Sequence, residues 1–274
     1  MPSPAWSSAG RGGGRNDGAA RAQRRLVKRA RIVGLQLVSI LVALVAWEVA
    51  ARGGWVDPLF VPAPSAVAAA FGRIGAAALR ALGDTLVKAG IAYGIAVVLG
   101  VGAGLALGSA RRLRDVLNPF VIGVYGIPKI LVLPWIVLLL GFGAAPAIVY
   151  GTIQAFFPIL LIVMGSVRDV DATLLTVARS YGARPWQLYW KVILPAIVPA
   201  VLAGMRLGIV FCLLGVLIVE MFAGVRGMGY VMGSLANGFR AAELFAVTGL
   251  VSAASIAIVL TLDVLNDRLA HWRG

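Results

Sequence analysis

The chain has 274 residues, of which 60% are hydrophobic and 13% are charged, and its mean hydropathy is +0.92. Soluble domains average about 45–50% apolar and about 25% charged residues, so this composition excludes an ordinary soluble domain and predicts a membrane protein. The 25 basic residues exceed the 11 acidic ones, but eight basic residues lie between Arg11 and Arg31, so this local excess does not predict a nucleic-acid groove or a nucleic-acid partner.

Several kinds of reactive site are excluded by residue type. The chain has one cysteine, Cys212, and one histidine, His271, which excludes a disulfide framework, a Cys/His metal site and most nucleophile–histidine catalysis. The phosphate-binding motif GxxxxGK[ST] is absent, because no lysine follows a glycine. We therefore expect no catalytic residue, no metal and no cofactor in this chain.

The first 31 residues are rich in Gly, Ser, Ala and Arg and show no apolar period, which predicts a disordered basic tail. Six segments follow that contain about the 20 apolar residues needed to cross a bilayer; they are 32–51, 86–108, 116–143, 144–165, 197–221 and 244–262. The first resembles a secretory signal in its basic flank, but signal cores have only about 7–15 residues, so we expect it to be retained. We predict an all-α membrane helix bundle.

The third segment contains prolines and glycines that predict a bent or broken helix, and only the turn-prone stretch 141–147 separates it from the fourth. Irregular backbone in hydrocarbon is tolerated only against protein or a water-lined cavity, so this span should lie inside the bundle. If the N-terminus is cytoplasmic, the inner segments hold 17 basic residues and the outer segments five. The positive-inside rule therefore predicts that both termini are cytoplasmic.

The second segment carries five glycines within an arc of about 120° on one helix face; they are Gly90, Gly94, Gly100, Gly104 and Gly108. Aligned small residues allow a second helix to approach closely. The alternative, scattered glycines in a span where glycine is common, stays open. The GVGAG stretch within this segment is no phosphate loop, because it lies mid-membrane with no strand before it.

Two helices are predicted in the loop after the fourth segment. Asp169 or Asp171 can cap a helix over 172–181, Gly182 is a left-handed stop, and Pro185 begins a second short helix.

In the second of these helices Trp186, Tyr189 and Trp190 share one face, while Pro195 and Pro199 lead back into the membrane. Such an aromatic helix pair needs a partner surface, or else forms an interfacial aromatic belt.

This loop resembles the cytoplasmic loop of ABC importer permeases, whose pattern is EAA, three residues, Gly, nine residues and I-x-L-P. Residues 176–178 (TVA), Gly182 and residues 192–195 (VILP) fall at that spacing. Thr176 replaces the usual glutamate, so a salt bridge from this position to an ATPase is not expected. The resemblance implies a loop that couples to an ATPase through Asp171, Thr176, Val177, Ala178, Arg179, Gly182, Ala183, Val192, Leu194 and Pro195.

The resemblance extends over residues 60–265 and points to the branch that imports nitrate, sulfonates and taurine. It implies the type I importer permease fold with six transmembrane helices, a permease homodimer in the inner membrane, two copies of a separate ATPase that bind ATP and Mg²⁺, and an extracytoplasmic solute-binding protein. The expected organisation is a tail (1–31), a first helix with an outer connection (32–59), a core (60–265) containing the coupling loop (166–196), and a cytoplasmic tail (266–274).

Three charged residues within spans are candidates for the translocation pathway, because ionisable groups in spans usually face a bundle interior or water; they are Lys129, Arg206 and Glu220. The alternatives are structural pairing or snorkelling for Arg206, structural pairing or an interfacial position for Lys129, and an interfacial pair with Arg226 for Glu220. Glu220 precedes a glycine-rich stretch, 224–233, that can form a re-entrant gate, whereas Glu48 is expected to be peripheral.

A secondary transporter, a channel and a membrane enzyme are the competing functions. A secondary transporter would need membrane carboxylates or internal repeats, a channel leaves the loop pattern unexplained, and an enzyme would need a catalytic constellation. The branch resemblance favours a small anion, a sulfonate, taurine or nitrate, as the solute. A thiamine-precursor pyrimidine or an aromatic acid is the alternative.

Overall fold

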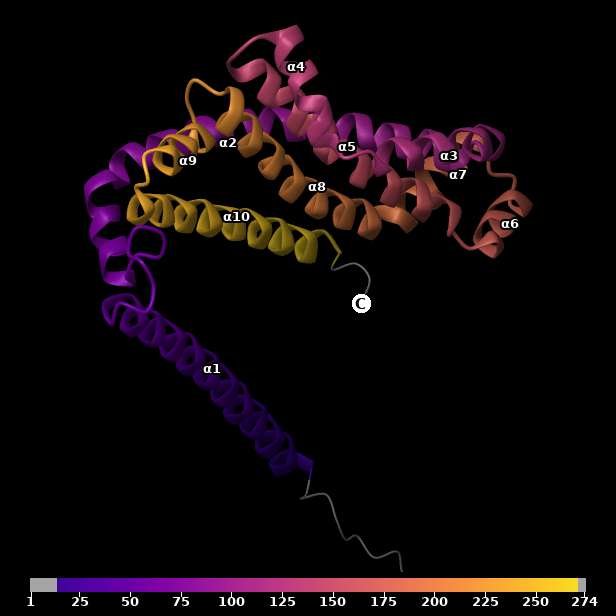
Figure 1. Ribbon diagram of the computed structural model, residues 1–274. Helices are drawn as coiled ribbons and strands as arrows, with labels where there is room; N and C mark the ends of the chain where they lie inside the picture. Colours follow the sequence, from indigo (N-terminus) through magenta and orange to yellow (C-terminus); the bar gives the residue numbers. More distant parts are fainter. Residues whose placement is uncertain (1–13, 271–274) are drawn as a thin grey trace, which may run out of the picture. The chain divides into compact units, whose positions relative to one another are not determined.

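The structure is a computed structural model that describes residues 14–270, and these residues form helices joined by short loops, with no strand among them (Figure 1). The α-helices are α1 (Gly14–Arg52), α2 (Pro64–Ser109), α3 (Arg111–Gly126), α4 (Leu133–Leu140), α5 (Ala144–Arg168), α6 (Ala172–Ser180), α7 (Pro185–Leu188), α8 (Leu194–Ala223), α9 (Met228–Asn237) and α10 (Ala241–Ala270). The predicted all-α fold is confirmed.

The chain divides into two compact units after Ser65, close to the boundary expected between residues 59 and 60. In the first unit, α1 begins at Gly14, so the prediction of a disordered tail is wrong for 14–31, and residues 1–13 lie outside the described residues. Residues 14–31 are rich in Ala, Arg, Gln, Leu and Lys, which have high helix propensity. The apolar residues that follow them form a helix, and this helix can extend backwards through 14–31. Glu48 on α1 accepts hydrogen bonds from the Ser65 amide and hydroxyl at 3.0 and 2.7 Å.

Five helices in the described residues are long and apolar enough to span a membrane, and there are six if α3 and the bent segment of η1 (Lys129–Val132) and α4 count together as one span. The two parts of this pair meet at an angle of 83°, which confirms the predicted break. Gly141 (φ 73°) and Gly143 (φ 130°) then turn the chain into α5. The second span is part of a longer helix than predicted, since α2 begins at Pro64.

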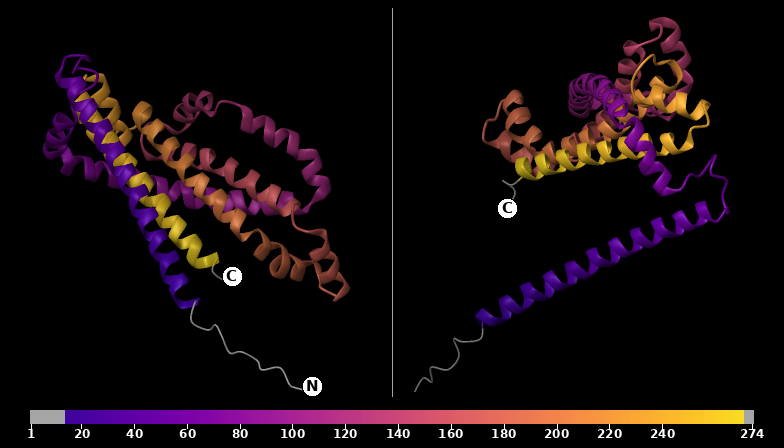
Figure 2. Two further views of the ribbon diagram at one scale, coloured as in Figure 1. Left: turned by 90° about the horizontal axis from the view of Figure 1, so that it is seen from below. Right: turned by 90° about the vertical axis from the view of Figure 1, so that its left-hand side faces the viewer.

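The main core lies where α5 packs along α8, and the left view of Figure 2 shows the two helices running beside each other. Helix α2 packs on α5 through three of its five aligned glycines. Cβ atoms built at Gly100, Gly104 and Gly108 would meet Ile159, Val163 and Val167 of α5 at 3.0 Å or less, whereas Gly90 and Gly94 meet nothing within 4 Å. The predicted close approach is therefore confirmed for the second half of the face only.

Adding one methyl group at Gly104 tests this helix contact. A Cβ at this position would lie 2.7 Å from the Val163 Cβ and 3.0 Å from the Leu160 carbonyl oxygen. We expect Gly104→Ala to lower the free energy of unfolding by about 1–3 kcal/mol through overpacking, measured by thermal unfolding in detergent. The matched control is Gly102→Ala, where a Cβ meets nothing within 4 Å and the change should be neutral or stabilising. Equal effects of both variants would contradict the contact.

A second, smaller cluster joins the first half of α2 to α9 and α10. Its buried residues are Ala78, Met228, Leu235 and Val247. Helix α9 also packs against α8 and α10. The glycine-rich stretch 224–233 thus leads into a short helix held on three others.

Candidate functional site

The segment between α5 and α8 contains α6, and a side chain fixes its beginning. The Asp171 carboxylate accepts a hydrogen bond from the Thr173 amide at 2.7 Å, which confirms Asp171 as the N-cap. The amide and hydroxyl of Thr173 lower the pKa of the Asp171 carboxyl below its usual value. Asp169 has another role, since it lies 3.1 Å from Arg168 in an ion pair.

The end of α6 is a Schellman motif centred on Gly182. Gly182 has φ +76°, its amide donates to the Arg179 carbonyl at 2.9 Å, and the Ala183 amide donates to the Ala178 carbonyl at 3.1 Å. The left-handed conformation favours glycine because a Cβ would clash there. The predicted stop is confirmed, and it sets the angle between α6 and the helix that follows.

The second predicted helix is not short. Residues 185–223 form one continuous helical stretch, in which a π-helical turn, Tyr189–Ile193, joins α7 to α8. The Arg184 amide donates to the Gln187 side-chain oxygen at 2.8 Å and so caps its start. Pro195 lies inside this stretch, directly after the π-helical turn, where it removes one helical hydrogen bond without ending the helix. The helix that follows Gly182 therefore continues without a break into the fifth span.

The aromatic residues of this helix do not all share one environment. Trp186 and Trp190 are 61% and 62% exposed, whereas the Tyr189 hydroxyl donates to the Leu105 carbonyl of α2 at 2.6 Å and also contacts Ser109. Tyr189 therefore fixes α7 to the end of α2.

The segment from α6 to the π-helical turn presents exposed apolar and aromatic side chains; they are Leu174, Val177, Tyr181, Trp186 and Trp190. Thr176, in the position of the usual glutamate, donates its hydroxyl to the Ala172 carbonyl at 2.9 Å and is occupied within its own helix. Val192, Leu194 and Pro195 are partly buried where α8 begins. Such a surface is suited to docking in a cleft of another protein.

Glu220 lies in a buried polar cluster between α2, α8 and the start of α9. Its side chain is 0% exposed. Its carboxylate accepts hydrogen bonds from Lys88 Nζ at 2.7 Å, from Thr85 Oγ1 at 2.7 Å and from the Gly229 amide at 2.9 Å. The alternative of an interfacial pair with Arg226 is wrong, because Lys88 is the counter-ion and only the backbone carbonyl of Arg226 takes part, accepting from Lys88 at 2.8 Å.

Lys88 and Thr85 are the functional candidates that sequence analysis missed. Thr85 also accepts a hydrogen bond from the Met228 amide at 2.7 Å, so both side chains connect α2 to the segment before α9. Lys88 is the one charged residue between 86 and 108. Because an ionisable residue within a span usually has a partner, the sequence alone could have identified Lys88 as a candidate.

Glycines make room for this cluster. Cβ atoms built at Gly227 and Gly229 would overlap the Glu220 side chain, and a Cβ at Gly224 would overlap the Glu220 backbone. Gly227 also has φ +118°. The sequence GVRGMG at 224–229 is thus explained by the close wrapping of backbone around one carboxylate.

The two other predicted pathway residues lie apart from this cluster. Arg206 of α8 pairs with Asp263 of α10 at 3.1 Å, which agrees with the structural alternative. Lys129, at the bend of the third span, lies 4.3 Å from the ring centre of Tyr125 and 5.6 Å from that of Phe157. No ion pair to Lys129 occurs in the part of the chain that the structure describes.

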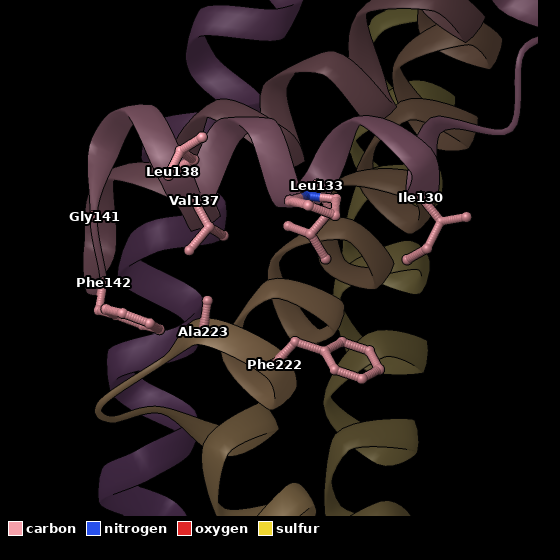
Figure 3. A pocket seen from close by; sticks show the side chains of 9 residues that line it. Ile130, Leu133, Val137, Leu138, Gly141, Phe142, Phe222 and Ala223 are labelled. Atoms are coloured by element: carbon pink, nitrogen blue, oxygen red, sulfur yellow. The ribbon is translucent and has the colours of Figure 1, made fainter.

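A cavity of about 710 Å³ lies between α4 and the end of α8, and Ile130 is the first residue in the chain that lines it. Figure 3 shows Leu133 and Val137 pointing from α4 towards Phe222 and Ala223. All of its lining residues are apolar or glycine; the others are Ile130, Pro134, Leu138, Gly141 and Phe142. The bent span and α8 therefore form an open apolar groove, and Lys129 is not among the residues that line it.

Comparisons with known proteins agree with this architecture. The family model described as "Binding-protein-dependent transport system inner membrane component" matches residues 96–273. The chain is 29% identical to the Taurine transport system permease protein TauC of Escherichia coli (strain K12), over 89% of this chain and 91% of that protein. It is 27% identical to the Putative aliphatic sulfonates transport permease protein SsuC of Bacillus subtilis (strain 168), over 88% and 87%.

A solved structure has a similar fold. A chain of the MetNI methionine ABC transporter, in an inward-facing conformation, matches with a TM-score of 0.60 and 21% identity, over 70% of this chain and 94% of that one. At this identity the likeness supports the fold alone.

Proposed function

The chain belongs to the family of binding-protein-dependent transport system inner membrane components, and on this premise we propose that it forms the membrane pathway of an ATP-driven importer of a small sulfonate such as taurine. The family is that of transport permeases, and the likeness to TauC and SsuC supports the sulfonate class of substrate. The observation that carries the proposal is the rigid, exposed segment of α6 and α7, which has the residue spacing of an ATPase-coupling loop.

In the proposed assembly, two copies of this permease bind two copies of a separate ATPase, which hold ATP and Mg²⁺, and an extracytoplasmic binding protein delivers the solute. The apolar surface on α6 and α7 then meets the ATPase. Both chain termini lie in the cytoplasm, as the distribution of basic residues favours. When the ATPase subunits close, they move α6, and the joint at Gly182 transmits this motion to α8.

Reconstitution tests this function. The purified chain is placed in liposomes with a candidate ATPase and binding protein, and uptake of labelled taurine is measured with ATP and with a non-hydrolysable analogue. We expect uptake only with ATP and all three proteins. Uptake without the ATPase would show a secondary transporter or a channel and would overturn the proposal.

Lys129 supplies the expected preference for an anion. Its ammonium group lies over aromatic rings and 3.4 Å from the Tyr125 carbonyl oxygen, with no carboxylate partner among the described residues, so its positive charge remains available to a sulfonate. We expect Lys129→Gln to raise the KM for taurine about tenfold, in keeping with the loss of one charge-assisted contact of about 1.5 kcal/mol or more. Lys129→Arg should retain the wild-type KM, and equal KM values for Gln and wild type would contradict this role.

A further inference from the structure

A second, polar cavity lies between the beginning of α3 and the end of α5. Its volume is about 270 Å³, and it is lined by Arg114, Asp115, Asn118, Met164, Gly165 and Arg168. A Cβ built at Gly165 would meet nothing within 4 Å, so the wall on the α5 side is open at this glycine. These residues belong neither to the exposed apolar surface of α6 and α7 nor to the Glu220 cluster.

The cavity is held open by the packing of two helices. Leu117 and Val121 of α3 pack against a cluster that contains Leu160 and Met164 of α5. One turn further along α3, Tyr125 lies 6.1 Å from Phe157 between ring centres. The cavity therefore lies at the end of an ordered helix pair.

Arg114 is withdrawn from water without a close acceptor. Its side chain is 16% exposed. Its guanidinium donates to the Gly108 carbonyl at 3.3 Å and to the Asp115 carboxylate at 3.4 Å. Charge-assisted bonds are usually about 2.7–2.9 Å, so these contacts leave donor capacity for a closer acceptor.

The charge around the cavity is positive. Arg112 and Arg114 lie in the first turn of α3. No side chain caps this helix at Ala110, so the amides of its first turn and the helix dipole add to the positive potential. Arg168 contributes a 67% exposed side chain from the opposite wall. Asp115 offsets one of these charges, and Asp169, which pairs with Arg168 at 3.1 Å, offsets another.

We propose that this cavity binds a single tetrahedral oxyanion, a phosphate or sulfonate group, between the guanidinium groups of Arg114 and Arg168. The planar fork of arginine matches such groups, and basic pockets between membrane helices hold lipid head groups. The group comes either from an anionic lipid or from a free oxyanion in solution. Because α5 ends at Arg168 and α6 begins at Ala172, the bound anion ties α3 to the base of the coupling segment.

The test is ligand-dependent stabilisation of the purified full-length chain in a neutral detergent. The unfolding temperature is measured against dihexanoyl phosphatidylglycerol in one arm, and against inorganic phosphate and methanesulfonate in another, with sodium chloride at equal ionic strength as the reference. Ligand that binds the folded state raises the unfolding temperature in a saturable way. Saturation with the lipid identifies a head-group site, and saturation with phosphate or methanesulfonate alone identifies a site for a free oxyanion.

Two exposed arginines give a matched pair of variants. Arg168→Gln removes one wall of the cavity, and we expect the apparent Kd of the stabilising ligand to rise about tenfold. Arg112→Gln removes the same charge at an exposed position that does not line the cavity, and it should leave the Kd within about twofold of the wild-type value. Stabilisation no greater than with sodium chloride, or an equal Kd in Arg168→Gln and wild type, would overturn the proposal.

Discussion

Replacing Lys88 by methionine should lower the free energy of unfolding by about 3–5 kcal/mol, the usual cost of removing one partner of a buried ion pair. Glu220 is fully buried, and Lys88 lies 2.7 Å from its carboxylate. Methionine fills most of the space of the lysine but leaves this carboxylate without its counter-ion. Unfolding of the purified protein in detergent, followed by tryptophan fluorescence against temperature and denaturant, measures the loss.

A second substitution separates charge from packing in this cluster. In the Lys88→Met background, Glu220→Gln removes the buried charge, while its side-chain oxygen can still accept from Thr85 and Gly229, as the carboxylate does. We expect the double variant to recover more than half of the lost stability. Lys129→Met is the matched control, because it removes a lysine that lies over aromatic rings, a contact worth about 0.5–1 kcal/mol, and makes a long hydrogen bond to a backbone carbonyl, but has no carboxylate partner among the described residues. A loss from Lys88→Met no larger than from Lys129→Met would contradict the buried pair.

Replacing Gly182 by valine should abolish substrate-stimulated ATP hydrolysis while leaving membrane insertion and abundance normal. Gly182 has φ +76°, and a residue with a Cβ in this conformation costs about 1–2 kcal/mol, with a β-branched one disfavoured further. The chain avoids the strain by turning differently, which breaks the bond from Ala183 to Ala178 and reorients α6. Coupling free energies between linked sites are typically about 1–3 kcal/mol, so a strain of this size is enough to uncouple α6 from α8.

Gly182→Asn is the control for this joint, because asparagine tolerates the left-handed conformation better than other residues with a Cβ. We expect it to retain most of the stimulated hydrolysis measured with the reconstituted complex. If the valine variant transports as well as wild type, the angle set at Gly182 has no part in transmission.

The sequence by itself determined the helical spans, the break in the third span and the two ends of α6. These features depend on neighbouring residues: runs of apolar side chains long enough to cross a bilayer, prolines and glycines that interrupt a helix, an aspartate cap, and a glycine in the left-handed conformation. The start of α1 at Gly14 and the continuity of residues 185–223 were predicted less well. Where a helix ends depends on whether an adjoining helix continues through that point.

The tertiary structure alone decided which charges are paired and which glycines form contacts. Lys88 and Glu220 lie 132 residues apart, and the sequence suggested Arg226 as a partner because it is near in the chain. Likewise, five glycines share a face of α2, but α5 touches only the last three. Helix periodicity determines which residues share a face, whereas the packing of helices distant in sequence determines what that face meets. The partners of Glu220 and the cavity between Arg114 and Arg168 therefore became visible only once the helices were packed.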